Sequence, residues 1–249
     1  MVRVALVSYL NTTPFLYGLK NCGLLQSHDF QFEAFYPSAC ANALLEGRSD
    51  VGLVPAAVLP YLKGFRIVGN TCIGATEAVR SVLLVSEVPL ENISTILLDY
   101  QSRTSVQLCR LLCADLWKIS PQFKPASEDY LDKVGKTTAA VVIGDRAFDE
   151  ALKYPFVYDL ASAWKTLSGL PFVFAVWVAS ENVSDEMLKP MLDALEFGVE
   201  HVEEAANEIA NNYPGNYQLK TYLSTNISYT LDAPKRKGLE TFLGRISTF

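Results

Sequence analysis

The chain has 249 residues, enough for one large domain or two smaller ones, each with its own core. Half of the residues are hydrophobic and the formal net charge is -6, so nucleic acid is not an expected partner. The apolar runs are too short to cross a bilayer, and the N-terminus lacks the features of a signal peptide. The five cysteines are odd in number and lack metal-site spacing, which favours a reduced, cytoplasmic protein.

Short β-rich runs alternate with helical patterns along the first three quarters of the chain. Their hydrophobic residues come in continuous runs, which is typical of strands covered on both faces. The alternation predicts an α/β fold with mostly parallel sheets flanked by helices. The predicted strands are 2–7, 30–36, 51–54, 66–69, 79–85, 94–98, 139–143, 155–158 and 172–179.

Two helices among these strands have recognisable start signals. Ser38 is expected to cap a helix that runs to Leu45 and stops before a glycine. Ser102 or Thr104 is expected to cap a helix that runs to about Trp117, because apolar residues recur there at helical spacing.

The C-terminal part changes character after Ser184. The pattern predicts no further strand, one long helix over 185–211, and a last helix that Asp232 caps. Helices after the extended run 172–179 indicate that the chain returns to where it began. We therefore expect a discontinuous first domain of residues 1–86 and 179–249 and an inserted second domain of residues 87–178.

Polar residues gather directly after the predicted strands, where ligands bind in open α/β sheets. Their hydroxyls, amides and backbone N–H groups favour a site for a small oxyanion near helix N-termini. Two structural alternatives stay open: a plain helix cap at 11–13, and a surface ion pair between Asp145 and Arg146. The polar groups are Asn11, Thr12, Thr13, Ser38, Ser102, Arg103, Thr104, Ser105, Gly144, Asp145 and Arg146.

The common catalytic motifs are absent from the sequence. The two histidines, His28 and His201, have no motif neighbours and are expected to be structural or exposed. No nucleophile elbow, zinc-binding helix motif, Walker loop or dinucleotide fingerprint occurs, so we expect neither a metal nor another cofactor. The residues alone therefore predict a two-domain α/β protein that binds a small anion.

Six ordered blocks between residues 4 and 180 resemble the chorismate dehydratase family. They are SYLNTTP at 8–14, LLEGRSDVGLVP at 44–55, VRSVLLVS at 79–86, LDYQSRTSVQL at 98–108, IGDRA at 143–147 and GLPFVFAVWVAS at 169–180. The resemblance implies a two-lobed fold like that of type II periplasmic binding proteins, with the ligand cleft between the lobes. It also implies dehydration of chorismate to 3-[(1-carboxyvinyl)oxy]benzoate, in the futalosine pathway to menaquinone.

The same resemblance implies roles for individual residues. Asn11 and Ser81 are the catalytic candidates, as hydrogen-bonding groups that orient the substrate, although a structural strand serine is an equally good interpretation of Ser81. Arg103 is a candidate charge partner. No side chain is an obvious base, so our hypothesis is that the substrate's enolpyruvyl carboxylate removes the ring proton, with Asp145 as the side chain to test. The candidate substrate contacts are Thr12, Ser38, Ser102, Thr104, Ser105, Gly144 and Asp145.

Other functions fit the same fold. A paralogous enzyme of the pathway acts on cyclic dehypoxanthine futalosine and would need a larger pocket. A solute-binding protein for a small carboxylate would be expected to carry a signal peptide, and a ligand-sensing regulator a DNA-binding segment. The expected partner is a small dicarboxylate, chorismate, and the sequence specifies no oligomeric state.

Overall fold

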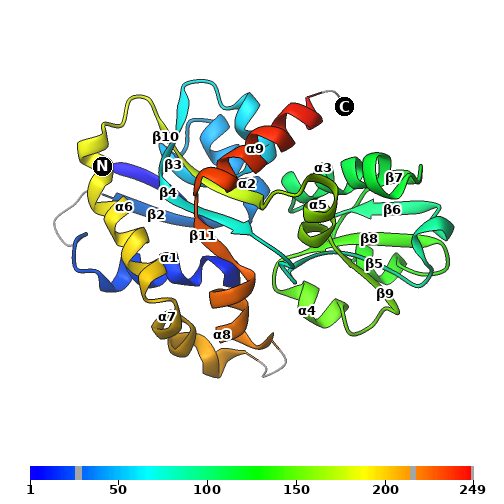
Figure 1. Ribbon diagram of the computed structural model, residues 1–249. Helices are drawn as coiled ribbons and strands as arrows, with labels where there is room; N and C mark the ends of the chain where they lie inside the picture. Colours follow the sequence, from blue (N-terminus) through cyan, green and yellow to red (C-terminus); the bar gives the residue numbers. More distant parts are fainter. Residues whose placement is uncertain (26–29, 214–216, 248–249) are drawn as a thin grey trace.

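The computed structural model describes residues 1–25, 30–213 and 217–247. These residues form a six-stranded sheet with the order β11-β4-β10-β3-β1-β2 and a five-stranded sheet with the order β7-β6-β8-β5-β9. Figure 1 shows the two sheets in separate lobes, each flanked by helices. We call the part built on the six-stranded sheet the first lobe and the part built on the five-stranded sheet the second lobe.

All nine predicted strands are present. The first lobe contains β1 (Val2–Val7), β2 (Phe30–Phe35), β3 (Val51–Pro55), β4 (Phe65–Ala75), β10 (Phe172–Ser180) and β11 (Ser228–Thr230). The second contains β5 (Val82–Ser86), β6 (Thr95–Leu98), β7 (Gln122–Pro125), β8 (Thr138–Ile143) and β9 (Phe156–Asp159). The prediction missed β7 and β11, which are short strands at sheet edges and carry no long apolar run.

The strand directions correct one expectation, because both sheets are mixed rather than mostly parallel. β1 runs parallel to β2 and β3, and β6 runs parallel to β7 and β8. β10 lies antiparallel between β3 and β4, β11 is antiparallel to β4, and β5 is antiparallel to β8 and β9. A continuous apolar run reports burial on both faces and not strand direction, which explains the error.

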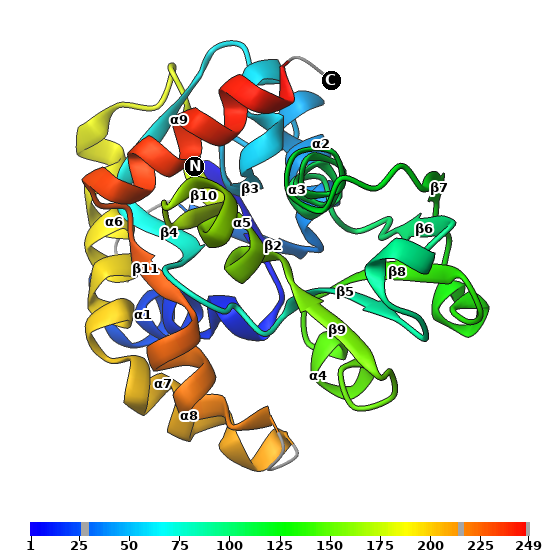
Figure 2. The ribbon, with the colours of Figure 1, turned by 45° about the vertical axis from the view of Figure 1, so that its right-hand side comes forward.

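Helices cover both faces of the first sheet. Phe15 of α1 packs edge-to-face on Trp177 of β10, with ring centroids 5.7 Å apart, whereas Phe242 of α9 packs on Phe172 of the same strand at 5.0 Å. Figure 2 shows α9 on one side of the sheet and α1 with α6 on the other. The first-lobe helices are α1 (Thr13–Asn21), α2 (Pro37–Leu45), α6 (Asp185–Glu200), α7 (Val202–Ile209), α8 (Leu219–Thr221) and α9 (Ala233–Ile246).

The second lobe carries α3 (Thr104–Leu112), α4 (Arg146–Glu150) and α5 (Leu160–Ser168). Short 3-10 turns occur at η1 (Leu10–Thr12), η2 (Ala56–Tyr61), η3 (Leu90–Asn92), η5 (Tyr130–Lys133) and η6 (Ala210–Asn212). Two π-helical turns, η4 (Cys113–Trp117) and η8 (Tyr222–Asn226), extend α3 and α8.

The helix starts agree only in part with the predicted caps. Tyr36 precedes the first residue of α2, so Ser38 lies inside the helix and does not cap it. Arg103 is the N-cap residue of α3 and makes no side-chain cap bond, so neither Ser102 nor Thr104 is the N-cap; the Ser102 hydroxyl, one residue earlier, still accepts a 3.0 Å hydrogen bond from the backbone N–H of Ser105. Asp232 accepts a bond from Lys235 N at 2.9 Å and confirms the predicted cap of α9.

The long C-terminal helix predicted over 185–211 is broken. α6 ends at Glu200, His201 leaves helical geometry, and α7 follows. The expectation of no strand after Ser184 is also wrong, since β11 pairs with β4.

The chain passes from the first sheet to the second between β4 and β5, and it returns between α5 and β10. β5 lies wholly in the second sheet and β10 wholly in the first. We propose that the inserted domain begins and ends at these crossings, at 76–81 and 169–171, rather than at residues 87 and 178.

Candidate active site

A cavity lies between the lobes, where β1, β3 and β8 end. Six polar residues line it together with apolar ones, and no charged side chain belongs to its lining among the described residues. The cleft between the lobes that the sequence predicts is therefore present. Its lining residues are Val7, Tyr9, Asn11, Pro37, Leu53, Pro55, Ile73, Val79, Ser81, Val82, Ser102, Thr104, Ser105, Ile143, Gly144, Phe174 and Ala175.

Asn11 lies in η1, directly after β1, and lines the cavity. Its side-chain oxygen is buried and has no hydrogen-bond partner within the described part of the chain. Leaving such a group without a partner costs about 1–3 kcal/mol, so a cavity ligand that donates to Asn11 would recover this energy. The alternative of a plain cap is not supported, because neither η1 nor α1 receives a side-chain cap bond.

Thr12 is buried beside Asn11 but is turned into the protein. Its hydroxyl lies 2.7 Å from the carbonyl oxygens of both Val7 and Tyr9, and Thr12 does not belong to the cavity lining. The single hydroxyl hydrogen is therefore used to close the turn after β1. Thr12 therefore supports the turn and not the surface of the cavity.

Ser81 lies at the crossing between the lobes, immediately before β5, and is buried in the cavity wall. Its carbonyl oxygen accepts a 2.9 Å hydrogen bond from Gly144 N. Its hydroxyl oxygen accepts a 2.8 Å hydrogen bond from the phenol of Tyr222. The structural interpretation of Ser81 and the functional one therefore both have a geometric basis.

The N-terminal end of α3 supplies three hydroxyl groups to the lining, and the helix dipole favours an anion there. The Thr104 hydroxyl donates to Phe174 O at 3.0 Å and accepts from Ala57 N at 3.2 Å, so it joins the lobes. The Ser102 hydroxyl accepts from Ser105 N at 3.0 Å. The Ser105 hydroxyl makes no hydrogen bond among the described residues, which makes it the best placed of the three for a ligand.

Two predicted contacts lie outside the cavity lining. The Ser38 hydroxyl donates to Tyr100 O at 3.3 Å and is buried in that contact. Arg103 is exposed and lines a different surface pocket beside α2 and η2. The structure therefore places Ser38 and Arg103 outside the lining of this cavity.

Gly144 and Asp145 follow β8 and have different surroundings. Gly144 has φ +71°, lines the cavity and lies against the ring of Tyr9. Asp145 does not belong to the lining; its Oδ1 accepts a 3.0 Å bond from Leu10 N. Burial raises the pKa of Asp145 to about 6, and the bond from Leu10 partly opposes this rise.

The surface ion pair considered between Asp145 and Arg146 does not form. Arg146 turns inward and places Nη2 2.6 Å from Oδ2 of Asp99, which is fully buried. Asp99 also accepts hydrogen bonds from the phenol of Tyr130 at 2.9 Å and from Ile143 N at 3.2 Å. The second lobe thus contains a fully buried and well-satisfied carboxylate, paired with the partly exposed Arg146, next to Ile143 of the cavity wall.

Tyr9 and Gln101 connect that charge pair to the cavity, and the sequence interpretation did not select either of them. The amide oxygen of Gln101 accepts a hydrogen bond from Arg146 at 3.3 Å and another from the phenol of Tyr9. Tyr9 itself lines the cavity. Both residues follow strand ends inside the motifs SYLNTTP and LDYQSRTSVQL, so the rule that selected their neighbours could have found them.

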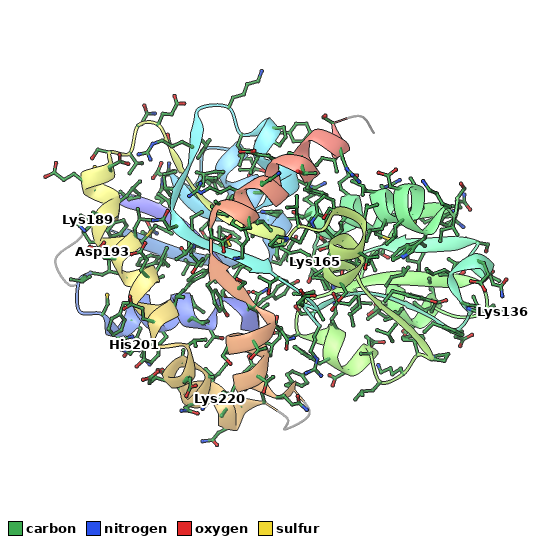
Figure 3. All side chains as sticks on the ribbon, in the orientation of Figure 1. Lys136, Lys165, Lys189, Asp193, His201 and Lys220 are labelled. Carbon is green, nitrogen blue, oxygen red and sulfur yellow. The ribbon has the colours of Figure 1, made fainter. Side chains whose placement is uncertain are left out.

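His201 has a structural role. Its Nδ1 lies 2.8 Å from Phe197 O and its ring stacks on Phe197. Figure 3 shows His201 at the end of α6, on the opposite side of the molecule from the second sheet. His28 lies outside the described residues.

Within 1–25, 30–213 and 217–247, histidine, cysteine and carboxylate side chains form no group of three or more suited to a metal. None of the helices in these ranges combines the length and apolar character needed to span a membrane.

Solved structures at low sequence identity show which fold this chain has. A protein of Archaeoglobus fulgidus matches with a TM-score of 0.78 at 14% identity, over 99% of this chain and 96% of that chain. A Candida albicans gene product, described as having the generic periplasmic binding protein fold, matches with a TM-score of 0.64 at 13% identity, over 100% and 90%. The periplasmic aliphatic sulphonate binding protein of Escherichia coli matches with a TM-score of 0.63 at 15% identity, over 100% and 91%. This chain therefore has the periplasmic-binding-protein fold that the sequence predicts.

The family model for menaquinone biosynthesis matches residues 2–248, and the chain belongs to that family. A chorismate dehydratase of Thermus thermophilus is 27% identical over 261 aligned residues, which cover 96% of this chain and 93% of the relative.

Proposed function

We propose that this protein is a chorismate dehydratase, a hydro-lyase that converts chorismate to 3-[(1-carboxyvinyl)oxy]benzoate in the futalosine pathway. The observation that carries the proposal is the unpartnered, buried oxygen of Asn11 in the wall of a cavity between two lobes. Membership of the menaquinone biosynthesis family and the similarity to a chorismate dehydratase support the choice of substrate. The cytoplasmic location and independence from cofactors stay predictions.

The reaction requires the protein mainly to orient the substrate. The C–H bond at the ring carbon that carries the enolpyruvyl ether breaks, and its electron pair forms a new ring double bond. The C–O bond of the hydroxyl group breaks on the adjacent ring carbon, at the other end of that double bond, and the hydroxyl leaves with a proton as water. The product ring is aromatic, which supplies a large driving force.

Neutral hydrogen-bonding groups suit this reaction. In the proposed complex the oxygen of Asn11 accepts from the ring hydroxyl, and the hydroxyl of Ser81 donates to the departing oxygen or to a carboxylate. Ser105 and the N-terminal end of α3 hold a carboxylate. A preorganised donor such as the Ser81 hydroxyl contributes roughly 10²–10³-fold to a rate.

The lining of the cavity supports the hypothesis that the substrate supplies its own base. No carboxylate or histidine belongs to the lining among the described residues. Asp145 is the acidic residue that we selected as the alternative base, and it is engaged by Leu10 N. In the proposed mechanism the enolpyruvyl carboxylate therefore takes the ring proton.

Hydrogen bonds between the lobes close the cavity. They include the contacts of Thr104 with Ala57 and Phe174 and the contact of Asp145 with Leu10. Substrate entry requires these bonds to open, and their return excludes water during the reaction.

The test is a mass-resolved assay of the purified protein with chorismate, in the presence of a chelator and without added cofactor. We expect an aromatic enolpyruvyl ether lighter than chorismate by one water. Recovery of unchanged chorismate would contradict the proposal. In that case binding of cyclic dehypoxanthine futalosine and of small carboxylates, measured by thermal shift, would distinguish the paralogous enzyme from a solute-binding protein.

A further inference from the structure

We infer that Tyr222 is a positioning residue that directs the hydroxyl hydrogen of Ser81 into the cavity. Tyr222 belongs to η8 in the C-terminal segment, far along the chain from the motifs that resemble the family. The inference rests on the proposed function, because Ser81 acts on a substrate only if this cavity is the active site.

The hydrogen bond between the two hydroxyls has a defined direction. The phenol of Tyr222 donates to the hydroxyl oxygen of Ser81 at 2.8 Å, and both side chains are buried. The Ser81 hydroxyl makes no second hydrogen bond in the part of the chain that the structure describes. A serine hydroxyl has one hydrogen and two lone pairs. Because Tyr222 occupies one lone pair, the hydrogen of Ser81 is left for a group in the cavity.

Both partners are held in place by further contacts. The carbonyl of Ser81 accepts from Gly144 N at 2.9 Å, and the preceding residue, Arg80, donates its backbone N–H to Asp159 at 2.7 Å. The ring of Tyr222 packs edge-to-face against Phe148 at a centroid distance of 4.8 Å. The backbone at Ser81 and the ring of Tyr222 are therefore both held in place around the hydrogen bond between the two hydroxyls.

The phenol of Tyr222 keeps its proton under physiological conditions. Its complete burial raises its pKa well above the ordinary value of 10.0. The phenol thus remains a donor to Ser81, and hydrogen bonds in a chain strengthen one another. This arrangement makes the Ser81 hydroxyl a better donor toward a departing oxygen.

Tyr229 provides a matched control for Tyr222. It is also a buried tyrosine of the C-terminal segment, in β11, but its hydroxyl has no hydrogen-bond partner among the described residues. Tyr229→Phe and Tyr222→Phe remove the same atom from similarly buried sites, and only the second change releases Ser81.

The experiment measures kcat and KM for chorismate in Tyr222→Phe, Tyr229→Phe, Ser81→Ala and the double variant Ser81→Ala/Tyr222→Phe. We expect Tyr222→Phe to lower kcat by about tenfold, the kinetic equivalent of one hydrogen bond, with KM little changed. Tyr229→Phe should keep the wild-type kcat. In the Ser81→Ala background Tyr222→Phe should have no further effect, because the two residues act as one unit.

A wild-type kcat in Tyr222→Phe, or an equal loss in Tyr229→Phe, would overturn the inference. The inference would also be overturned if adding Tyr222→Phe to Ser81→Ala lowered kcat by the same factor as in the wild type. If Tyr222→Phe does not fold, Phe148→Leu loosens the ring of Tyr222, and its effect on kcat should likewise disappear when Ser81 is alanine. A wild-type protein that leaves chorismate unchanged would overturn the proposed function and this inference together, whereas an active protein with a fully active Tyr222→Phe variant overturns this inference alone.

Discussion

The backbone N–H of Leu10 donates a 3.0 Å hydrogen bond to Oδ1 of Asp145 and so joins the loop after β1 to the start of α4 in the other lobe. Burial raises the pKa of Asp145 from 3.8 to about 6 despite this bond. Since its folded pKa lies above the unfolded one, the folded state binds more protons in the interval between the two values. The contribution of this carboxyl to stability is therefore most favourable below about pH 4 and is lost as the pH rises to about 6.

Asp145→Asn should reveal this dependence, because asparagine keeps an acceptor for Leu10 but does not ionise. We expect the variant to gain stability relative to the wild type as the pH rises from 4 to 6, by up to about 3 kcal/mol, and to keep that gain above pH 6. Urea unfolding at pH 4, 5, 6 and 7 measures the gain. Asp50→Asn is the control with the opposite sign, because the hydrogen bond from Arg3 lowers the pKa of Asp50. A gain in Asp145→Asn that does not vary with pH would contradict the prediction.

The same Asp145→Asn protein tests the identity of the base. If the enolpyruvyl carboxylate of chorismate removes the ring proton, the variant should retain turnover within about threefold of the wild type, far from the roughly 10²-fold effect of losing a general base. Turnover and substrate binding are measured in parallel at pH 7. Abolished turnover with intact binding would make Asp145 the base instead.

Substitution of Asn11 should lower turnover strongly and change the free energy of unfolding little. Its side-chain oxygen has no partner within the described residues, so Asn11→Leu removes no hydrogen bond at that atom and should change the free energy of unfolding by about 1 kcal/mol or less. Its turnover should fall by roughly 10²–10³-fold, and Asn11→Asp should also be strongly impaired. Asn42→Leu, at an exposed position of α2, is the matched control and should retain activity. Proportionate losses of stability and turnover in Asn11→Leu would mean that Asn11 has only a structural role.

Local sequence rules identified the cavity residues that come directly after strands. Asn11, Ser102, Thr104, Ser105 and Gly144 all follow predicted strands, and all line the cavity. Asn11 follows a strand of the first sheet and the other four follow strands of the second, so the strand-end rule places them at the edge of each sheet, and the packing of the two lobes brings these edges together.

The remaining features depend on packing between distant segments, which local patterns do not encode. The Thr12 hydroxyl points to a backbone carbonyl and the Arg103 side chain points into solvent, and residue spacing determines neither direction. Tyr222 reaches Ser81 because the C-terminal segment packs against the crossing between the lobes. Nothing in the apolar spacing around Tyr222 distinguishes it from Tyr229, whose hydroxyl has no partner among the described residues.

Alanine substitutions at Gly144 and Gly169 distinguish the effect of backbone strain from the effect of a contact with the cavity-lining Tyr9. Both have φ +71°, so alanine should cost each position roughly 1–2 kcal/mol of stability. A Cβ at Gly144 would lie 3.0 Å from the ring of Tyr9, whereas a Cβ at Gly169 would meet no atom within 4 Å. Gly144→Ala must therefore displace Tyr9 as well.

We expect Gly144→Ala to lose turnover and Gly169→Ala to retain it, with the larger loss of stability in Gly144→Ala because Tyr9 must move. Thermal unfolding and the chorismate assay on both variants measure the two effects. Equal turnover in the two proteins would show that the position of Tyr9 does not matter for the cavity.

Arg146 should be important for stability because its partner, Asp99, is fully buried. Arg146→Met keeps much of the apolar stem but leaves the Asp99 carboxylate without a countercharge, which should cost about 3 kcal/mol. Arg3→Met is the matched control. Arg3 also binds a carboxylate at 2.6 Å, but Asp50 is partly exposed to water, and an exposed pair contributes little.

Urea unfolding of both variants at pH 7 compares the two ion pairs directly. The larger loss in Arg146→Met should be accompanied by reduced turnover, because Arg146 anchors Gln101 and Gln101 accepts the hydrogen bond from Tyr9 in the cavity wall. Similar small losses in both variants would contradict the prediction, since they would mean that Tyr130 and the backbone N–H of Ile143 satisfy the Asp99 carboxylate without its countercharge.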